Sequence, residues 1–234
     1  MGNLRVILNQ GAIPREVQEL IMQTRILQKY QKYKESLRLN QTQISVLIGA
    51  ILGDGTLRIP KGAINANFKV EQGLKQKDYV FWKYEVFKEW VTNPPEISFR
   101  YDENRIPYEK SWWFRTLSHP KLTLFHKMFY KHGIKIVPKN IAGLFDPLAL
   151  AVWIMDDGCL SRNKIDISAY SFRLEEIKLL QEALLQKFAL ESNFYKDRDK
   201  GFRMYFRKTE TLKLVRIISK FVIPNLAYKI LVTP

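Results

Sequence analysis

Two short apolar stretches stand out from an otherwise mixed chain. Residues 47–55 (LIGAILGDG) and residues 150–158 (LAVWIMDDG) each run through a block of apolar side chains and end in Asp-Gly. A helix-capping signal precedes each stretch, Asn40 or Thr42 before the first and Asp146-Pro147 before the second. Asn, Thr and Asp cap helix N-termini, Pro suits the first helical position, and Gly ends helices. The pattern predicts two buried helices, each presenting an aspartate at its C-terminal end.

The patterns that follow the two apolar stretches repeat in the same order. Alternating apolar and polar residues indicate strands, and apolar residues three and four apart indicate helices. The first half is predicted to contain a strand at 64–70, a helix at 75–90, a hairpin of 97–101 with 111–116 and a helix at 118–132. The second half is predicted to contain a strand at 164–170, a helix at 174–189, a hairpin at 194–207 and a helix at 209–221.

This repeat predicts the fold class and the domain boundaries. Each half reads helix, hairpin, helix, hairpin, helix, so we expect an α+β protein with two similar halves. Residues 1–40 are predicted to form a basic N-terminal extension, residues 41–140 the first half and residues 141–234 the second half. The extension is expected to be helical from Pro14. Its Lys and Arg residues either contact a DNA backbone or form a solvated face.

The predicted strands carry one apolar and one polar face. In the first strand, Ile64, Ala66, Phe68 and Val70 alternate with polar residues. Such a strand packs its apolar face on helices, and a two-stranded ribbon can read base edges in the major groove. An ordinary solvated sheet face is the alternative. If the ribbons read DNA, base contacts are assigned to the outward side chains: Arg58, Asn65, Asn67, Lys69, Arg100, Arg115, Lys164, Asp166, Ser168, Lys196, Arg198, Arg203 and Arg207.

Net charge and hydropathy indicate which kind of molecule the protein binds. A formal net charge of +15 attracts a polyanion, which favours nucleic acid over a generic basic ribosomal or membrane-surface protein. Hydrophobic residues make up 46% of the chain, enough for a sizeable core. No apolar run is long enough to cross a bilayer, so a membrane is not expected as a partner. The segment Met1–Leu8 lacks the apolar stretch of a secretory signal, and no transit peptide is evident.

Cysteine and histidine offer no soft-metal site. Cys159 is the only cysteine, which excludes an intrachain disulfide or a cysteine zinc cluster and favours a reducing compartment. We expect Cys159 to be a small packing residue. His119, His126 and His132 are poorly spaced for one helix face, so a zinc site is not expected.

The aspartates at the two predicted helix ends are the candidate chemistry. Helices packed side by side would bring the carboxylates of Asp54 and Asp157 together, and Gly49 and Gly53 would permit close packing. Neighbouring carboxylates at helix C-termini are unfavourable unless a cation lies between them. Mg²⁺ suits a site of few carboxylates, backbone carbonyls, waters and phosphates, and two such ions could promote phosphodiester hydrolysis. For one stretch alone, a buried helix with a polar cap is an equal alternative.

Both stretches resemble the LAGLIDADG motif, and the chain from about residue 40 resembles the single-chain, two-motif homing endonucleases encoded in organellar group I introns. The resemblance implies a monomer of two pseudo-symmetric αββαββα units, with a central pair of motif helices and two antiparallel sheets forming a saddle over duplex DNA. It implies a double-strand break with short 3′ overhangs in a long asymmetric target. It also implies Mg²⁺ as cofactor, Mn²⁺ as a substitute, Ca²⁺ binding without cleavage, and a location in the mitochondrion or chloroplast.

The resemblance also assigns a metal site. Asp54 and Asp157 are the expected metal-binding and catalytic carboxylates, with Gly53 and Asp156 as neighbouring donors. The second motif departs from the family pattern because Asp156 precedes Asp157. The register selects Asp157, and Asp156 is expected to contribute only its backbone carbonyl. Val152 replaces a small residue, which makes the helix interface less symmetric.

Three polar residues outside the motifs match family positions near the metals. Lys135 and Lys229 match basic residues that would polarise water or steady transition-state charge, with a phosphate contact or a solvated lysine as the alternative. Gln72 matches a polar residue that orients water. Its expected counterpart in the second half is Tyr170, a departure that would make the two cutting sites chemically unequal.

The sequence leaves three other functions open. An RNA-splicing maturase on the same scaffold would bind intron RNA. A DNA-binding regulator would bind duplex without cutting it, and a generic RNA-binding protein would show no preference for duplex DNA. The presence of both Asp54 and Asp157 favours the nuclease.

Overall fold

The computed structural model describes residues 15–232, which fall into two compact units divided after Leu37. The predictions about Met1–Leu8 and about a helix start at Pro14 lie outside the described residues. In the first unit, α1 (Arg15–Ser36) is a helix whose residues are exposed or half-buried. Within residues 15–232, no helix has the length and apolarity needed to cross a membrane.

The two motif helices, α2 and α6, begin where their capping signals predict. Asn40 caps α2 (Gln41–Leu52) and forms a reciprocal capping box with Gln43. Asp146 caps α6 (Pro147–Asp157), which starts at the predicted proline. These caps satisfy amide groups that a helix start leaves unpaired. The side chains that cap the helices are therefore sufficient to fix both starting points.

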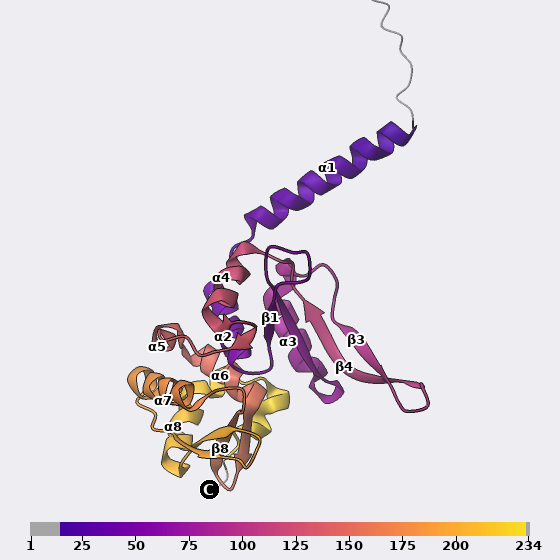
Figure 1. The fold of residues 1–234 in the computed structure, drawn as a ribbon. Coiled ribbons are helices and arrows are strands. Elements are labelled where there is room, and N and C mark those ends of the chain that lie inside the picture. The colour runs from indigo at the N-terminus through magenta and orange to yellow at the C-terminus, as the bar shows by residue number, and fades with distance from the viewer. Residues whose placement is uncertain (1–14, 233–234) are drawn as a thin grey trace, which may run out of the picture. The chain divides into compact units, whose positions relative to one another are not determined.

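The motif helices pack directly against each other, and glycine makes the close approach possible (Figure 1). A Cβ at Gly49 would lie 2.3 Å from the carbonyl oxygen of Ala149 and 2.7 Å from Cβ of Val152. A Cβ at Gly53 would lie 2.4 Å from Cβ of Asp156. All three distances are far below van der Waals contact, so any larger residue would separate the helices. The bulkier side of the interface is α6, as its sequence indicates.

Each half contains the same succession of elements, αββαββα. The first half comprises α2, β1 (Thr56–Arg58), β2 (Asn67–Gly73), α3 (Lys77–Phe87), β3 (Glu96–Tyr101), β4 (Pro107–Arg115) and α4 (Pro120–Phe129). The second comprises α6, β7 (Gly158–Ser161), β8 (Lys164–Ala169), α7 (Leu174–Phe188), β9 (Asn193–Lys196), β10 (Phe202–Phe206) and α8 (Lys208–Ile218). Shorter elements connect or extend these: η1 (Leu74–Gln76), η2 (Lys88–Trp90), β5 (Tyr130–Lys131), β6 (Ile134–Lys135), α5 (Ile141–Leu144), η3 (Ser219–Phe221) and η4 (Pro224–Lys229).

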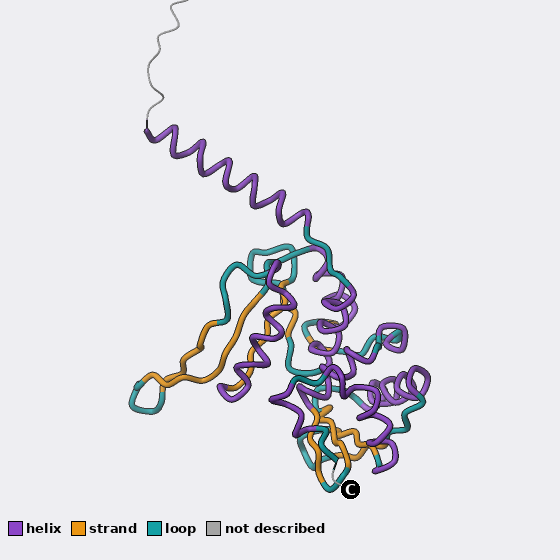
Figure 2. The backbone as a smooth tube through the Cα atoms, turned by 180° about the vertical axis from the view of Figure 1, so that it is seen from behind, coloured by secondary structure: helices purple, strands orange, loops and turns teal. Residues whose placement is uncertain are grey.

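The two halves build sheets of identical topology. The strand orders are β1-β2-β4-β3 and β7-β8-β10-β9, and every pairing is antiparallel. Figure 1 shows the long β3–β4 hairpin reaching away from its sheet, and Figure 2 shows the strands gathered in two separate groups. The prediction of an α+β fold with two pseudo-symmetric units is confirmed.

Burial alternates along β8 and along the second part of β10 as the hydropathy pattern predicts. In β8, Ile165 and Ile167 are fully buried, whereas Asp166 and Ser168 are only half-buried. In β10, Met204 is fully buried. One face of each sheet therefore belongs to the core, and the other keeps its polar side chains accessible.

The prediction for the first strand was wrong at its N-terminal end. We expected a strand from Ile64, but β2 begins at Asn67 and Ile64 is 88% exposed. The amide of Ala66 donates to the Thr123 hydroxyl at 2.9 Å, and its carbonyl accepts from the His119 amide. These bonds connect the segment to the start of α4 and not to a neighbouring strand. The alternation of apolar and polar residues before Asn67 therefore does not correspond to a strand.

The helix predicted over residues 118–132 is also shorter, and its end places a lysine. α4 stops at Phe129 and the chain enters the β5–β6 hairpin. His132 and Gly133 both adopt positive φ, at 51° and 76°, and form the turn. The turn reverses the chain so that Lys135 comes back past the end of α4.

The packing of α2 on α6 predicts a large effect of one methyl group. We expect Gly49→Ala to destabilise the protein by about 1–3 kcal/mol or more, because the added Cβ would overlap backbone and side chain of α6. Urea unfolding followed by circular dichroism measures the change. Gly143→Ala is the control, since a Cβ at Gly143 meets nothing within 4 Å. Equal unfolding midpoints for the two variants would contradict the tight interface.

Candidate active site

The ends of the motif helices bring the two predicted aspartates into electrostatic contact. Asp54 follows Gly53, the residue that caps α2, and Asp157 is the last residue of α6. Asp54 is exposed and Asp157 is half-buried. The charge of Asp54 is one of the causes that raise the pKa of Asp157, as expected for neighbouring carboxylates. The sequence placed these side chains together correctly.

Asp157 is the carboxyl most affected by this crowding. Burial raises its pKa first, and the charges of Asp54 and Asp156 raise it further, to about 8. Lys135 and Lys229 act in the opposite direction without cancelling the rise. A carboxyl of this kind holds a proton at neutral pH unless a cation takes the proton's place.

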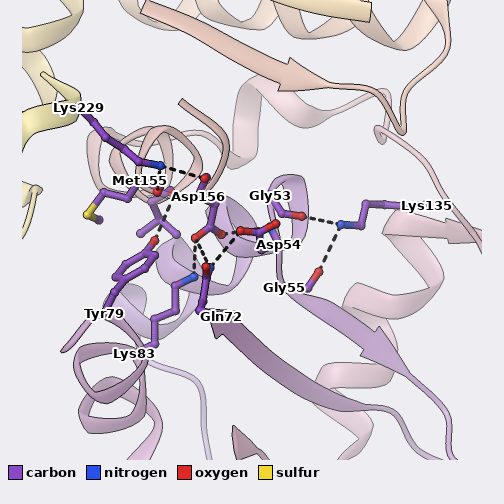
Figure 3. Close-up of polar contacts among 11 residues, drawn as sticks. Gly53, Asp54, Gly55, Gln72, Tyr79, Lys83, Lys135, Met155, Asp156 and Lys229 are labelled. Carbon is purple, nitrogen blue, oxygen red and sulfur yellow. Dashed lines mark hydrogen bonds and ion pairs between the residues drawn. The ribbon is translucent and has the colours of Figure 1, made fainter. Parts of the chain in front are cut away.

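One lysine contacts the end of each motif helix (Figure 3). Lys135 Nζ donates to the carbonyl of Gly53 at 2.8 Å. Lys229 Nζ donates to the carbonyls of Met155 and Asp156 at 2.6 Å and 3.0 Å. Burial lowers the pKa of both lysines. A carbonyl oxygen has two lone pairs, so Gly53 and Asp156 can each accept a lysine proton and still face a cation.

Gln72 joins the two halves of the site. Its Nε2 donates to Asp54 Oδ2 at 3.1 Å and to Asp156 Oδ1 at 3.2 Å. Residue parity in β2 puts Gln72 on the same side as Val70, which is fully buried. At the end of the strand, this side of the sheet faces the motif-helix ends. An amide with two donors can therefore hold both carboxylates at once.

The predicted second-half counterpart of Gln72 was wrong. The pairing registers of β1–β2 and β7–β8 align Gln72 with Ala169, not with Tyr170. Ala169 is fully buried and has no polar group. The Tyr170 hydroxyl donates instead to Asp197 at 2.7 Å and accepts from Arg203 at 3.0 Å. The two halves of the site therefore differ more than the sequence indicated, because the second half has no polar residue at the position of Gln72.

Asp156 contributes more than the predicted backbone carbonyl. Its side chain and that of Lys83 are both 0% exposed, and they form an ion pair at 2.7 Å. Asp156 Oδ2 also accepts from the Asp54 amide at 3.3 Å. Lys83 Nζ lies 4.1 Å from the ring centroid of Tyr79, whose hydroxyl donates to the Val152 carbonyl. Burial raises the pKa of Asp156, and the charge of Lys83 opposes that rise.

Sequence reasoning missed Lys83 and Tyr79. The one available signal is that Lys83 is in line with the buried residues Val80 and Phe87, at a position where the helical pattern favours an apolar side chain. The expectation for Cys159 was also wrong. Cys159 is exposed, because it lies in β7 on the side opposite the buried Gly158.

The donor set is of the kind that a hard divalent cation prefers. Within the part of the chain that the structure describes, no group of three or more His, Cys, Asp or Glu side chains is arranged to hold a metal. The carboxylates of Asp54 and Asp157 and the carbonyls of Gly53 and Asp156 offer only oxygen. Mg²⁺ prefers oxygen donors and retains several positions for water and phosphate. The raised pKa of Asp157 is a second sign of a site that lacks positive charge.

A basic groove leads away from Asp54 over the first sheet. One cavity of about 500 Å³ is lined by Asp54 and Gln72 together with residues of the sheet. A second cavity of about 400 Å³ shares Arg58, Lys69, Glu71 and Lys110 with the first. The shared lining connects the carboxylate to a surface with several cations. Such a surface concentrates a polyanion near the site.

The predicted base-contacting side chains differ in exposure. Seven are exposed: Arg58, Arg100, Arg115, Lys164, Lys196, Arg198 and Arg207. Five are half-buried: Asn65, Lys69, Asp166, Ser168 and Arg203. Asn67 is 4% exposed, so its assignment to base readout was wrong. Asn65 lies in a bend before β2, and its amide oxygen accepts from the Thr123 hydroxyl at 3.1 Å.

The outer faces of the two sheets carry different central charges. On the first, Glu71 accepts from Lys69 at 2.6 Å and from Lys110 at 2.7 Å. Burial opposes ionisation of Glu71, but these bonds outweigh it and lower the pKa to about 2. On the second sheet the central side chain is Arg203, which donates to Tyr170. The two halves therefore present unlike chemistry to a shared partner.

Comparison with known proteins agrees with this geometry. A model of the LAGLIDADG DNA endonuclease family matches residues 44–214. The chain is 28% identical to DNA endonuclease I-ChuI of Chlamydomonas applanata, over 83% of this chain and 96% of that protein. It is 26% identical to cytochrome b mRNA maturase bI2 of Debaryomyces hansenii, over 82% of this chain and 74% of that protein. A solved structure of the homing endonuclease I-WcaI bound to its DNA recognition sequence shares the fold, with a TM-score of 0.78 over 97% of both chains at 22% identity.

The pKa of Asp157 predicts how metal binding depends on pH. The folded, metal-free protein keeps a proton on Asp157 up to about pH 8, whereas the unfolded chain releases it near about pH 4. The contribution of this proton to the free energy of unfolding is thus fully present below about pH 4 and is lost as the pH rises through about 8. Because a divalent cation must displace the proton, we expect Ca²⁺ binding at pH 6.5 to release about one proton and to tighten toward pH 8.

Isothermal titration calorimetry in buffers of different ionisation enthalpy measures the released proton. Asp157→Asn should abolish the release, because an amide does not titrate. Proton release that persists unchanged in Asp157→Asn would refute the assignment to this carboxyl.

Proposed function

The chain belongs to the LAGLIDADG DNA endonuclease family, and from this premise we propose that it is a homing endonuclease. It binds a long asymmetric duplex and hydrolyses one phosphodiester bond in each strand, leaving short 3′ overhangs. The reaction requires Mg²⁺, with Mn²⁺ as a substitute, and Ca²⁺ binds without supporting cleavage. The observation that carries the proposal is the joint site of Asp54 and Asp157, with half-buried Lys135 at one helix end and buried Lys229 at the other.

Particular residues support hydrolysis at this site. Asp54 and Asp157, with the carbonyls of Gly53 and Asp156, would hold Mg²⁺. When bound, Mg²⁺ would supply Lewis-acid activation of water and stabilise the leaving oxygen. Gln72 orients water beside Asp54, which it already contacts at 3.1 Å.

The two lysines complete the proposed chemistry. Lys135 and Lys229 are ammonium groups next to the carboxylates, and they stabilise negative charge that develops on the phosphate. Their pKa values are lowered by burial, which also suits them to exchange a proton with water. Their burial fixes each ammonium group at its helix end, so little reorganisation accompanies the reaction.

The two sheets are proposed to read different half-sites. Phosphate contacts from exposed arginines and lysines supply affinity that falls steeply with salt, and base-edge contacts supply specificity. The Glu71-centred face and the Arg203-centred face differ in hydrogen-bonding pattern. A target with twofold symmetry would mismatch one of them, so the recognised site is asymmetric.

The proposal extends to the oligomeric state and the origin of the protein. Both motif helices lie in one chain and pack on each other, which supports a monomer with a complete site. Relatives include the intron-encoded endonuclease ai4 of Dictyostelium discoideum, 29% identical over 57% of this chain. We therefore place the coding sequence in a group I intron of a mitochondrion or chloroplast.

Removing either ligand carboxylate should abolish cutting while sparing DNA binding. The target is first obtained by incubating the full chain with a random duplex library and Mg²⁺ and sequencing the cut ends. We expect Asp54→Asn and Asp157→Asn to slow cleavage of that target more than about 100-fold, because each removes a metal ligand. Gel-shift affinity in Ca²⁺ should change by less than about threefold, since neither side chain reads bases.

Asp102→Asn is the matched control, because Asp102 lies in the β3–β4 turn and its carboxylate accepts from the amides of Asn104 and Ile106. It should cut at the parent rate. Full cleavage by Asp54→Asn and Asp157→Asn together would disprove the proposed metal site. Sequence-specific binding without any cutting by the parent would instead identify a DNA-binding regulator.

An RNA maturase is the second candidate, and one observation favours it. Relatives from Debaryomyces hansenii and Saccharomyces cerevisiae, each 26% identical, are cytochrome b mRNA maturases. If this chain acts in splicing by binding the intron RNA and not by cutting, Asp54→Asn should still accelerate excision of a group I intron transcript. Measured splicing rates equal with and without the protein would exclude the activity for that transcript.

A further inference from the structure

The Lys83–Asp156 ion pair is completely buried. Both side chains are 0% exposed and their charged atoms are 2.7 Å apart. The Lys83 ammonium group lies over the Tyr79 ring at 4.1 Å from its centroid. Burying two charges costs about as much as their attraction returns, and apolar residues of similar volume often stabilise a core equally well. Stability alone therefore gives no reason for this pair.

The pair is one end of a chain of contacts that reaches the candidate metal ligand (Figure 3). Lys83 fixes Asp156 Oδ1, which also accepts from Gln72 Nε2 at 3.2 Å. Asp156 Oδ2 accepts from the amide of Asp54 at 3.3 Å. Gln72 in turn donates to the Asp54 carboxylate. Both the backbone and the side chain of Asp54 are thus held by groups that Asp156 orients.

The second half has none of these polar groups at the matching positions. The position of Asp156, directly before the motif aspartate, is occupied by Gly53 in the first motif. The buried residues of α3 and α7 have the same spacing, which aligns the two helices. The aligned sets are Val80, Lys83 and Phe87 in α3 and Ile177, Leu180 and Leu184 in α7. Leucine thus replaces Lys83, and glycine replaces Asp156. Ala169 already replaces Gln72 in the strand register.

We propose that Lys83 and Asp156 are a positioning pair that fixes Asp54 and Gln72, so that the two strands of the target are cut with unequal dependence on the pair. The inference rests on the proposed endonuclease function. Lys83 acts through Asp156 and touches no reacting atom. Its ammonium group pairs with the Asp156 carboxylate at 2.7 Å and so holds that carboxylate in place for Gln72.

Three variants of the full chain separate positioning from folding. Lys83→Leu introduces the residue found at Leu180 and leaves Asp156 buried without its cation. The double variant Lys83→Leu with Asp156→Ala removes both charges and keeps the Cβ that packs on Gly53. Lys88→Leu is the control, because Lys88 pairs with Glu85 at the surface, where both side chains are 61% exposed.

Strand-resolved cleavage is the first measurement. The selected duplex is labelled at one end of each strand and cut with Mg²⁺. We expect Lys83→Leu and the double variant to slow one strand by about tenfold to a hundredfold and the other by less than about threefold. On a supercoiled plasmid, nicked circles should accumulate. Lys88→Leu should cut both strands at the parent rate.

Two measurements on the metal-free protein need no cleavage. The melting temperature should fall in Lys83→Leu and recover in the double variant, because only the single variant leaves an unpaired buried charge. Hydrogen exchange at the Asp54 amide should accelerate in both, because its acceptor is displaced or absent. A purely structural role predicts instead that the double variant regains parent rates on both strands.

The outcomes separate this inference from the proposed function. If the parent cuts both strands and Lys83→Leu slows them equally, or the double variant cuts both strands at the parent rate, the positioning role is wrong and the endonuclease stands. If the parent cuts no duplex with Mg²⁺, the endonuclease proposal fails and the strand argument fails with it. Unchanged Asp54 exchange in the double variant would overturn the positioning role by itself.

Discussion

Electrostatic repulsion between carboxylates at the tips of two closely packed helices is the constraint on which this structure depends. Gly49 and Gly53 let the helices approach, and the approach brings Asp54 and Asp157 together. Helix C-termini add partial negative charge at the same place. The site therefore needs positive charge, which the protein supplies only in part through lysines around its edge. We propose that a divalent cation supplies the positive charge that these lysines do not.

The fold is nearly symmetric, but the chemistry at its centre is not. The two sheets have the same strand order, and Lys135 and Lys229 contact equivalent helix ends. In contrast, Lys83 and Gln72 have only apolar counterparts. The two halves therefore offer similar helix ends, and the different side chains around those ends make them chemically unequal. An asymmetric substrate is compatible with such a site, because neither half has to serve both strands.

The groove over the first sheet links recognition to chemistry. Glu71 holds Lys69 and Lys110 in fixed positions on that surface, and the same lining reaches Asp54. Ordered cations lose less conformational freedom when a phosphate or a base edge replaces their present partner. The cations of the first sheet are thus already in place before a polyanion binds. Lys69 and Lys110, which now contact Glu71, could contact the polyanion instead.

The sequence by itself determined the repeated αββαββα plan, the starts of both motif helices and the pairing of Asp54 with Asp157. Hydropathy period and capping residues are local properties, and a duplicated motif supplies the one long-range contact that the site requires. The tertiary structure alone decided that Asn67 is buried, that Ala169 and not Tyr170 matches Gln72, and that Lys83 reaches Asp156. These facts depend on strand register and on which helix packs over which motif. Periodicity along one chain cannot encode either, because both are set by contacts between segments far apart in the sequence.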